Sequence, residues 1–198
     1  MRRILLVRHG ETAWNAAGRL LGSTDQPLTD VGRDQARALA GRLGDAELVG
    51  VWTSALGRAR ETGAIVAEVL GLPAPEVDEE LREREFGVFE GLTREDCETQ
   101  YPAAWRDWKT QTGTPPGGET RAAATARLGR ALARIATGDG GAVAVISHGA
   151  VMRLWLMEVL GTSIPIVANG ATFVVEHDRG AIRVAPRPAD GRRPADAR

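Results

Sequence analysis

Short apolar runs alternate along the chain with longer segments in which apolar residues recur every three or four positions. The strand-like runs are 4–7, 49–52 and 142–146, and the helix-like segments are 29–43, 58–70, 119–136 and 150–160. Runs that are apolar at successive positions are typical of strands buried on both faces of a sheet. The alternation therefore predicts an α/β fold, a three-layer α/β/α sandwich with a mostly parallel central sheet.

The ends of the expected helices carry capping signals. Thr29 can cap the N-terminus of 29–43, and Gly71 follows the last residue of 58–70. The stripe expected to face the core from the first of these helices is Val31, Ala36, Leu39, Ala40 and Leu43. The other expected elements are an irregular charged stretch at 78–91, short helices at 93–101 and 103–109, and a hairpin of 172–176 with 181–184.

The composition is that of an ordinary globular chain of 198 residues, with 43% hydrophobic and 26% charged residues. We expect a single domain over 1–185 and a disordered polar tail over 186–198. A net charge of −1 argues against a nucleic-acid or membrane partner. Cys97 is the single cysteine, which excludes an internal disulfide and fits a cytoplasmic location. We expect neither a signal peptide nor a membrane span, and both a monomer and a homodimer stay open.

Two histidines stand directly after strand-like runs. His9 follows the run 4–7 through Arg8, His148 follows 142–146 through a serine, and each histidine precedes a glycine. In α/β sheets ligands bind beyond the carboxyl ends of the strands. An arginine with paired donors, an imidazole and a flexible backbone at that point suit a phosphoryl group.

Two more polar residues fall at the same predicted edge of the sheet. Asn15 offers an amide donor, and Arg58 opens a helix whose N-terminus favours an anion. Taken singly, Arg58 is better explained by a surface ion pair, and His148 by a packed or capped core histidine. Taken together with the first histidine and its arginine, these residues indicate an anion site.

Short blocks in a fixed order carry a resemblance to a known family. They are LVRHGET (6–12), PLT (27–29), SALGRA (54–59), LRE (81–83), PGGE (116–119) and SHG (147–149). On these blocks the chain resembles the histidine phosphatase superfamily, in its phosphoglycerate-mutase-like branch. The resemblance extends to sugar-phosphoglycerate phosphatases and α-ribazole phosphatase-like enzymes, and it implies a phosphoglycerate-mutase-like fold.

The resemblance implies a role for each residue of the predicted anion site. His9 would be the nucleophile and would pass through a phosphohistidine. The phosphoryl oxygens would be bound by Arg8, Arg58 and His148, with help from Asn15. The flanking arginines should lower the pKa of the nucleophile, which must be neutral to attack phosphorus.

Glu83 is implied as the proton donor to the leaving alkoxide and then as the base for water. Among the acidic residues of 78–85, only the family pattern selects it. It needs a raised pKa and therefore a partly desolvated pocket. No group of His, Asp or Glu has convincing metal-ligand spacing, so we expect no metal and no other cofactor.

Some positions depart from the family pattern. Relatives often carry Gln and Trp around the glycine that is Gly22 here, whereas this chain has Leu21 and Ser23, and a Trp is common where Phe89 stands. We expect these four residues to bind the other end of the substrate at the pocket rim. A lid over the site and a packed helical cover are both open for Trp105, Arg106, Trp108 and Lys109.

The leading prediction is a metal-independent phosphatase that hydrolyses a phosphomonoester of a small soluble metabolite. The first alternative is a 2,3-bisphosphoglycerate-dependent phosphoglycerate mutase. Such mutases usually carry a longer insertion between the Glu83 region and the last histidine than the stretch 91–145 allows. The second alternative, a catalytically silent ligand-binding protein on the same fold, is disfavoured because every implied catalytic position is present.

Overall fold

Six strands form the centre of the molecule in the computed structural model, which describes residues 2–110, 112–138, 140–178 and 181–187. The strands are β1 (Arg3–Arg8), β2 (Leu48–Ser54), β3 (Glu76–Asp78), β4 (Ala142–Ser147), β5 (Thr172–Asp178) and β6 (Ala181–Arg187). Their order in the sheet is β3-β2-β4-β1-β5-β6. Strands β1 to β4 pair with one another in parallel. Strand β5 pairs antiparallel with β1, and β6 pairs antiparallel with β5. The expected mostly parallel sheet is confirmed.

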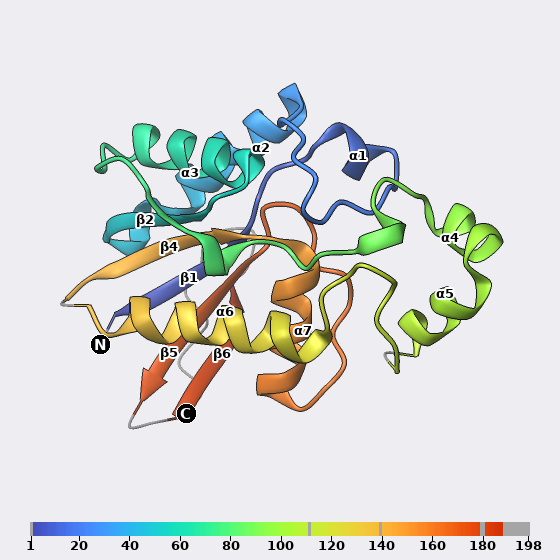
Figure 1. The fold of residues 1–198 in the computed structure, drawn as a ribbon. Coiled ribbons are helices and arrows are strands. Elements are labelled where there is room, and N and C mark those ends of the chain that lie inside the picture. Colours follow the sequence, from blue (N-terminus) through green and yellow to red (C-terminus); the bar gives the residue numbers. More distant parts are fainter. Residues whose placement is uncertain (1, 111, 139, 179–180, 188–198) are drawn as a thin grey trace.

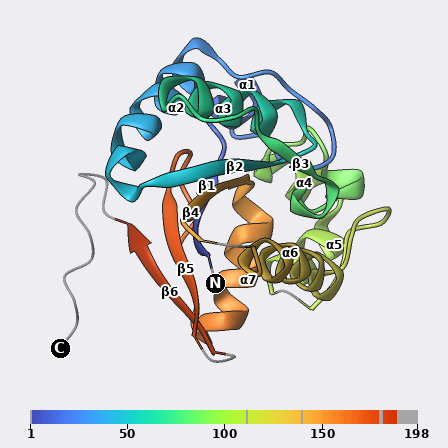
Figure 2. The same ribbon diagram turned by 90° about the vertical axis from the view of Figure 1, so that its left-hand side faces the viewer.

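Helices cover both faces of this sheet (Figure 1). The longer helices are α2 (Asp30–Leu43), α3 (Gly57–Val69), α6 (Arg121–Ala136) and α7 (Gly149–Leu160). The shorter ones are α1 (Ala13–Ala16), α4 (Arg94–Gln100), α5 (Pro102–Lys109) and the 3-10 turns η1 (Gly44–Ala46), η2 (Glu79–Leu81) and η3 (Gly87–Phe89). Figure 2 shows α2 and α3 on one face and α6 and α7 on the other. Helices α4 and α5 lie beyond the carboxyl ends of the parallel strands (Figure 1).

The alternation of side chains along β1 divides the core into two layers. Leu5 and Val7 pack with the apolar residues of α2 and α3, whereas Ile4 and Leu6 pack with those of α6 and α7. All four side chains are fully buried, and each burial stabilises the fold by about 1.5–3 kcal/mol. Packing on both faces therefore holds the end of β1, where the first site residues stand, in a fixed place.

The N-terminal half of the chain follows the expected pattern closely. Thr29 caps α2, since its side-chain oxygen accepts a hydrogen bond from the amide of Gly32. Val31 was expected in the buried stripe, but its side chain is 55% exposed. It precedes Ala36 by five residues, which turns it about 140° away from the stripe. Strand β3 was not expected, because a three-residue segment with two acidic residues shows no strand pattern.

The C-terminal hairpin is longer than expected. Pro186 and Arg187 belong to β6, where they pair with Phe173 and Thr172 of β5, so the expected disordered tail does not begin at residue 186. The remainder of that tail, 188–198, lies outside the described residues.

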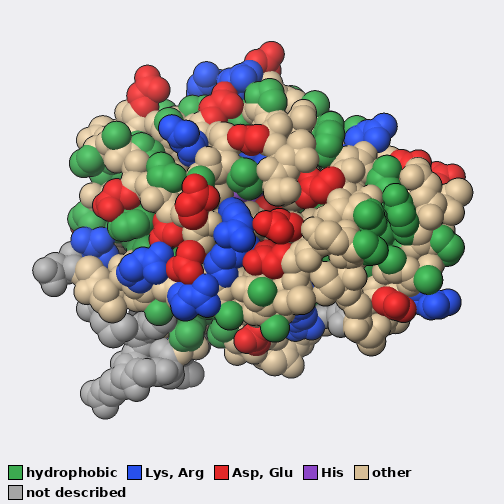
Figure 3. All heavy atoms as spheres, in the orientation of Figure 1, with side chains coloured by type: hydrophobic (Ala, Val, Ile, Leu, Met, Phe, Trp, Pro, Cys, Tyr) green, Lys and Arg blue, Asp and Glu red, His purple; other side chains and the backbone are tan. Residues whose placement is uncertain are grey.

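Basic and acidic side chains lie next to each other on the face that α6 crosses (Figure 3). Arg130 and Arg134 of α6 pair with Glu80 at 2.7 and 3.0 Å. These arginine side chains are half exposed or more, so each pair contributes only about 0–1 kcal/mol. Over the part of the chain that the structure describes, no helix combines the length and the apolar character that crossing a bilayer requires.

Candidate active site

His9 follows the last residue of β1, and its ring is fixed in one tautomer. Its Nδ1 lies 2.6 Å from the carbonyl oxygen of Gly10, which can only accept, so Nδ1 carries the proton. The other nitrogen, Nε2, is left with a lone pair and accepts a hydrogen bond from Nε of Arg58 at 3.3 Å. Burial first, and then the charges of Arg58 and Arg8, lower the pKa of His9 well below its usual range. The ring is therefore neutral at pH 7, with Nε2 unprotonated.

The glycine after this histidine is required by space. A Cβ on Gly10 would lie 2.4 Å from the carbonyl oxygen of Gly32, because α2 begins against this turn. The amide of Gly10 donates to Oγ1 of Thr62 on α3. A flexible backbone was expected of this glycine from the sequence; the structure shows in addition that close contact with α2 excludes a side chain.

Arg58 lies in the first turn of α3 and is fully buried. Its Nη1 donates to the carbonyl oxygen of Thr24 at 3.0 Å, and its Nη2 donates to that of Gly22 at 2.7 Å. Asp25 lies 3.5 Å from Nη1. These contacts fix the plane of the guanidinium beside His9, so a surface ion pair does not describe this arginine.

Arg8 and His148 approach the same point from β1 and from the end of β4. The rings of His148 and His9 lie 5.0 Å apart, tilted by 60°. Within the described residues, Nε of Arg8 and both ring nitrogens of His148 are buried without a hydrogen-bond partner. Burial and the charge of Arg58 lower the pKa of His148 well below its usual range. A Cβ on Gly149 would lie 3.0 Å from Nε of Arg8, so this glycine makes room for the arginine.

The amide of Asn15 is oriented by its neighbours. Its Oδ1 accepts from the amide of Thr12 and from Nδ2 of Asn169, both at 3.3 Å. Nδ2 of Asn15 is consequently left to donate, and Asn15 lines the cavity described below. Asn169 also donates to the carbonyl oxygen of His9 at 2.9 Å.

Glu83 is buried against the N-terminus of α7. Its Oε1 accepts from the amides of Arg84 and Val151 at 2.8 and 2.7 Å, and its Oε2 accepts from the amide of Ala150 at 2.9 Å. Burial raises the pKa of Glu83, although the three amides and the charge of Arg58 oppose the shift. Oε2 has the smaller number of donors, so it is the oxygen better able to hold a proton.

A cavity of about 560 Å³ opens from this cluster toward α4 and α5. Its lining includes Arg8, Asn15 and Glu83 on one side and Trp105 and Trp108 of α5 on the other. The volume exceeds what a phosphoryl group fills, which leaves room for a larger leaving group. Trp105, Trp108 and Lys109 line this cavity, and Arg106 does not.

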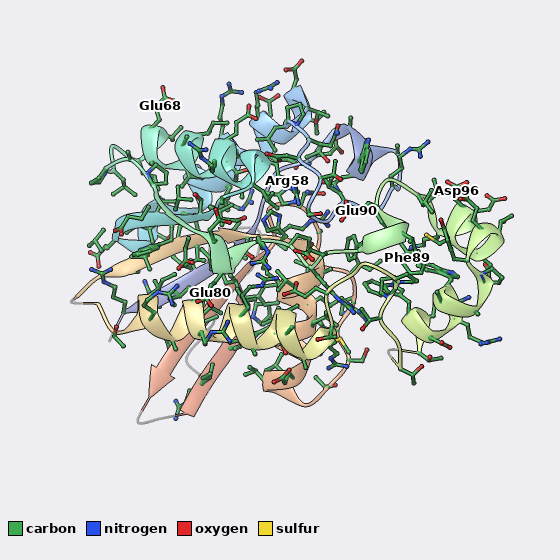
Figure 4. All side chains as sticks on the ribbon, viewed as in Figure 1. Arg58, Glu68, Glu80, Phe89, Glu90 and Asp96 are labelled. Carbon is green, nitrogen blue, oxygen red and sulfur yellow. The ribbon has the colours of Figure 1, made fainter. Side chains whose placement is uncertain are left out.

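The four rim residues expected from the sequence lie in different places. Leu21 lines the cavity, whereas Gly22 and Ser23 do not. Gly22 instead supports Arg58 through its carbonyl oxygen. Phe89 was expected at the rim, but its ring is fully buried on the α4–α5 side of its loop (Figure 4). It packs edge-on against Tyr101, Trp105 and Trp108, and this aromatic cluster accounts for its burial.

Glu90 lies in a segment that matches the family pattern, at Glu90 and Gly91, but it was assigned no role from the sequence. Its carboxylate accepts from the amides of Gly22, Ser23 and Thr24, at 3.2, 2.9 and 3.4 Å. The carbonyl oxygens of Gly22 and Thr24 in this loop hold Arg58. Figure 4 shows that Arg58 and Glu90 come from different elements. Glu90 thus acts on the cluster through this loop.

Arg127 of α6 holds the chain segment that precedes Glu83, as Glu90 holds the loop at 22–24. It is buried, it forms a two-point ion pair with Glu119, and its Nη1 donates to the carbonyl oxygens of Glu80 and Arg82. The stretch that it holds leads directly into Glu83. Among the described residues, no group of three or more His, Cys, Asp or Glu side chains is placed to hold a metal ion.

Known proteins share both the sequence pattern and the fold. A probable phosphoglycerate mutase from Serratia proteamaculans is 38% identical over 165 residues, covering 81% of this chain and 76% of that protein. A metal-independent phosphoserine phosphatase from Arabidopsis thaliana is 36% identical over 178 residues, covering 87% and 75%. The structure of a mycobacterial glucosyl-3-phosphoglycerate phosphatase in complex with VO3 superposes with a TM-score of 0.84 at 27% identity, covering 94% of this chain and 98% of that one.

The family model that describes the sequences of the histidine phosphatase superfamily (branch 1) matches residues 4–185 of this chain. The resemblance read from the short sequence blocks is therefore confirmed, as is the fold. This chain belongs to the histidine phosphatase superfamily and is a phosphoric monoester hydrolase.

Proposed function

We propose that the protein hydrolyses a phosphomonoester of a small soluble metabolite through a phosphohistidine on His9, without a metal ion. The observation that carries the proposal is the state of the His9 ring. Its Nδ1 proton is held by the carbonyl oxygen of Gly10, and its Nε2 lone pair faces Arg58 in a buried cluster of donors. A neutral imidazole with one fixed tautomer is a competent nucleophile.

In the first step, Nε2 of His9 attacks phosphorus and the bond from phosphorus to the ester oxygen breaks. Arg8, Arg58 and His148 bind the non-bridging oxygens, and Asn15 adds its amide. Because phosphoryl transfer depends mainly on positioning and on charge neutralisation, donors in a buried site can supply most of the catalysis. The unpartnered nitrogens of Arg8 and His148 support this role.

Glu83 gives the proton of its Oε2 to the leaving oxygen, and the alcohol departs. A water molecule then attacks the phosphohistidine and returns a proton to Glu83, which restores the enzyme and releases phosphate. Burial of this carboxyl supports the role, because a raised pKa lets it arrive protonated.

The first experiment compares two of the three histidines of the chain, His9 and His177. Wild-type protein should hydrolyse p-nitrophenyl phosphate in the presence of EDTA, and mass spectrometry of the quenched reaction should find an acid-labile phosphate on His9. His9→Ala should lose both signals. His177→Ala is the matched control, since His177 lies in β5, outside the sequence blocks that carry the family resemblance, and should keep both. Full hydrolysis by His9→Ala would reject the mechanism.

The relative from Serratia proteamaculans is named as a probable phosphoglycerate mutase, so phosphoglycerate mutase activity is the second candidate function. The test is incubation of 3-phosphoglycerate with a bisphosphate primer. We expect release of inorganic phosphate. Formation of 2-phosphoglycerate faster than phosphate would replace hydrolysis with the mutase reaction as the main activity.

A further inference from the structure

The hydroxyl group of Thr62, on α3, completes a closed ring of contacts around the side chain of His9. That side chain is held at both ring nitrogens: Nδ1 lies 2.6 Å from the carbonyl oxygen of Gly10, and Nε2 accepts from Nε of Arg58 at 3.3 Å. Both of these neighbours bind Oγ1 of Thr62, Gly10 through its amide at 3.1 Å and Arg58 through its carbonyl oxygen at 2.8 Å. One side chain therefore joins the two residues that hold the His9 ring.

Both functions of this hydroxyl group are used, and their directions are fixed. The hydroxyl has one proton, and the carbonyl oxygen of Arg58 can only accept, so the proton lies between these two oxygens. The lone pairs of Oγ1 are then left for the amide of Gly10, which can only donate. Thr62 is 1% exposed, so bulk water does not compete for these bonds. A side chain without a hydroxyl group would leave the amide of Gly10 without this acceptor.

Gly10 carries the position of Thr62 over to His9. The same glycine supplies the amide that bonds Thr62 and the carbonyl oxygen that faces Nδ1 of His9. On its other side it lies against α2, where a Cβ would meet the carbonyl oxygen of Gly32 at 2.4 Å. Helix α2 thus limits the position of Gly10 by contact, and α3 fixes it by a hydrogen bond. The direction of the Gly10 carbonyl in turn decides which nitrogen of His9 keeps the proton.

The guanidinium group of Arg58 has supports of its own. The carbonyl oxygens of Gly22 and Thr24 accept from it at 2.7 and 3.0 Å. These bonds do not involve Thr62, so the guanidinium should stay in place when the hydroxyl group is removed. We therefore expect the loss of this hydroxyl to affect the state of the His9 ring more than the binding of an anion.

We propose that Thr62 is a positioning residue that keeps the proton of His9 on Nδ1 and directs its Nε2 lone pair at the phosphorus of the substrate. The inference rests on the proposed phosphatase function, in which Nε2 is the attacking atom. Thr62 acts through Gly10, without contact to the substrate.

The first test observes the His9 ring directly, by 15N NMR of the imidazole nitrogens at neutral pH without substrate. Protonated and unprotonated ring nitrogens have well-separated 15N shifts, and the His9 signals are assigned by their loss in His9→Asn. The wild type should show a protonated Nδ1 and an unprotonated Nε2. Thr62→Val keeps nearly the same shape without the hydroxyl group. It should move both signals toward averaged values, because the proton then exchanges between the two nitrogens.

The second test is kinetic. Thr62→Val should lower kcat/KM for p-nitrophenyl phosphate about tenfold, the factor that one hydrogen bond carries. Inhibition by inorganic phosphate should change by no more than about twofold, since the anion donors stay in place. Thr62→Ser restores the hydroxyl group and should keep the wild-type signals and kcat/KM within about twofold. Thr62→Cys keeps only a weak acceptor and should fall between the two; it carries the test if the valine variant does not fold.

Thr125→Val is the matched control. Thr125 is also a buried threonine in a helix, and its hydroxyl group donates to the carbonyl oxygen of Ala122 at 3.3 Å, away from His9. This variant also loses a hydroxyl group from the core of the protein. It should nevertheless show wild-type His9 signals and wild-type kcat/KM.

Unchanged His9 signals in both Thr62→Val and Thr62→Cys would overturn the proposal. An equal kinetic loss in Thr125→Val would also overturn it, since the loss would then follow from any missing core hydroxyl. A loss in Thr62→Ser as large as in Thr62→Val would assign the effect to the methyl group and overturn it as well. Full hydrolysis by His9→Ala would instead reject the proposed function, whereas the NMR signals would still decide whether Thr62 holds the His9 ring.

Discussion

Replacing Glu83 with glutamine tests the proton donor with little change in shape. The amide is as large as the carboxyl group but cannot give up a proton to an alkoxide. General acid catalysis contributes about 10²–10⁴-fold in rate where the leaving group needs a proton. We therefore expect Glu83→Gln to lower kcat/KM for an alkyl phosphate by that factor.

The structural cost of this substitution follows from the hydrogen bonds of Glu83. The amide oxygen can keep the place of Oε1, which accepts from Arg84 and Val151. The NH2 group then takes the place of Oε2 and faces the amide of Ala150, so two donors meet. The loss of one buried bond costs about 1–3 kcal/mol. The variant should fold with reduced stability, and chemical denaturation must accompany the kinetics.

The assay separates the two effects by the choice of substrate. p-Nitrophenol leaves without protonation, so Glu83→Gln should retain most of its kcat/KM for p-nitrophenyl phosphate, a constant that covers the steps up to release of the alcohol and not the later attack of water. Glu85→Gln is the matched control, because Glu85 is a partly exposed acid two residues away, and it should behave as the wild type on both substrates. An equal loss on the alkyl and the aryl ester would refute the role of Glu83 as the acid.

The pH profile gives an independent check of the same group. Hydrolysis of the alkyl ester requires protonated Glu83, so kcat/KM should fall as pH rises through its raised pKa. This alkaline limb should be missing in Glu83→Gln. A limb that persists unchanged in the variant belongs to another group.

Three further predictions concern the support of the site. Arg127→Met removes the two-point ion-pair partner of the Glu119 carboxylate, which is 10% exposed and is left with Arg82 at 3.9 Å. Urea denaturation should therefore show a loss of up to about 3–5 kcal/mol, and a loss below about 1 kcal/mol would contradict a structural role for the pair. Glu90→Gln should lower kcat/KM on every substrate alike, since it loosens the loop that holds the active-site arginine; a change on one substrate only would contradict this. His9 and His148 have lowered pKa values, so the unfolded chain binds more protons below its ordinary histidine pKa of about 6.5. Stability should be present above that pH and be lost as pH falls below it, and thermal melts of the His9→Asn, His148→Asn double variant should show a weaker dependence.

The sequence predicted those parts of the fold that depend on local patterns. Buried strands such as β1 and β4 are continuous apolar runs, and the capped helix after Thr29 has clear signals. Strand β3 was not predicted from the sequence, because its short, charged segment has no strand pattern and becomes a strand by pairing with β2. Val31 was assigned to the buried stripe because it is hydrophobic, but its position along α2 places it outside that stripe.

The candidate site also contains residues that could be predicted from local sequence patterns and residues that could not. Residues at strand and helix ends, such as His9, Arg58 and His148, could be placed together because the topology of a parallel sheet gathers them. Phe89 could not be placed, since its burial depends on aromatic partners in later helices. Glu90 belongs to a segment that matches the family pattern, but its role could not be predicted, because its partners in the loop at 22–24 are 66 to 68 residues earlier in the chain.

The unpartnered donors of the site link anion binding to the stability of the fold. A buried polar group without a partner costs about 1–3 kcal/mol, and Arg8 and His148 both contribute such groups. An anion could accept from Nε of Arg8 and from the one ring nitrogen of neutral His148 that carries a proton. Any ligand bound only by the folded state adds about 2.7 kcal/mol at a hundred times its Kd. The two apolar layers around β1 must therefore tolerate a site that is destabilising until it is filled. In the proposed mechanism these donors would face the charge that develops on the transferred phosphoryl group, so stability lost in the free protein would be recovered as transition-state binding.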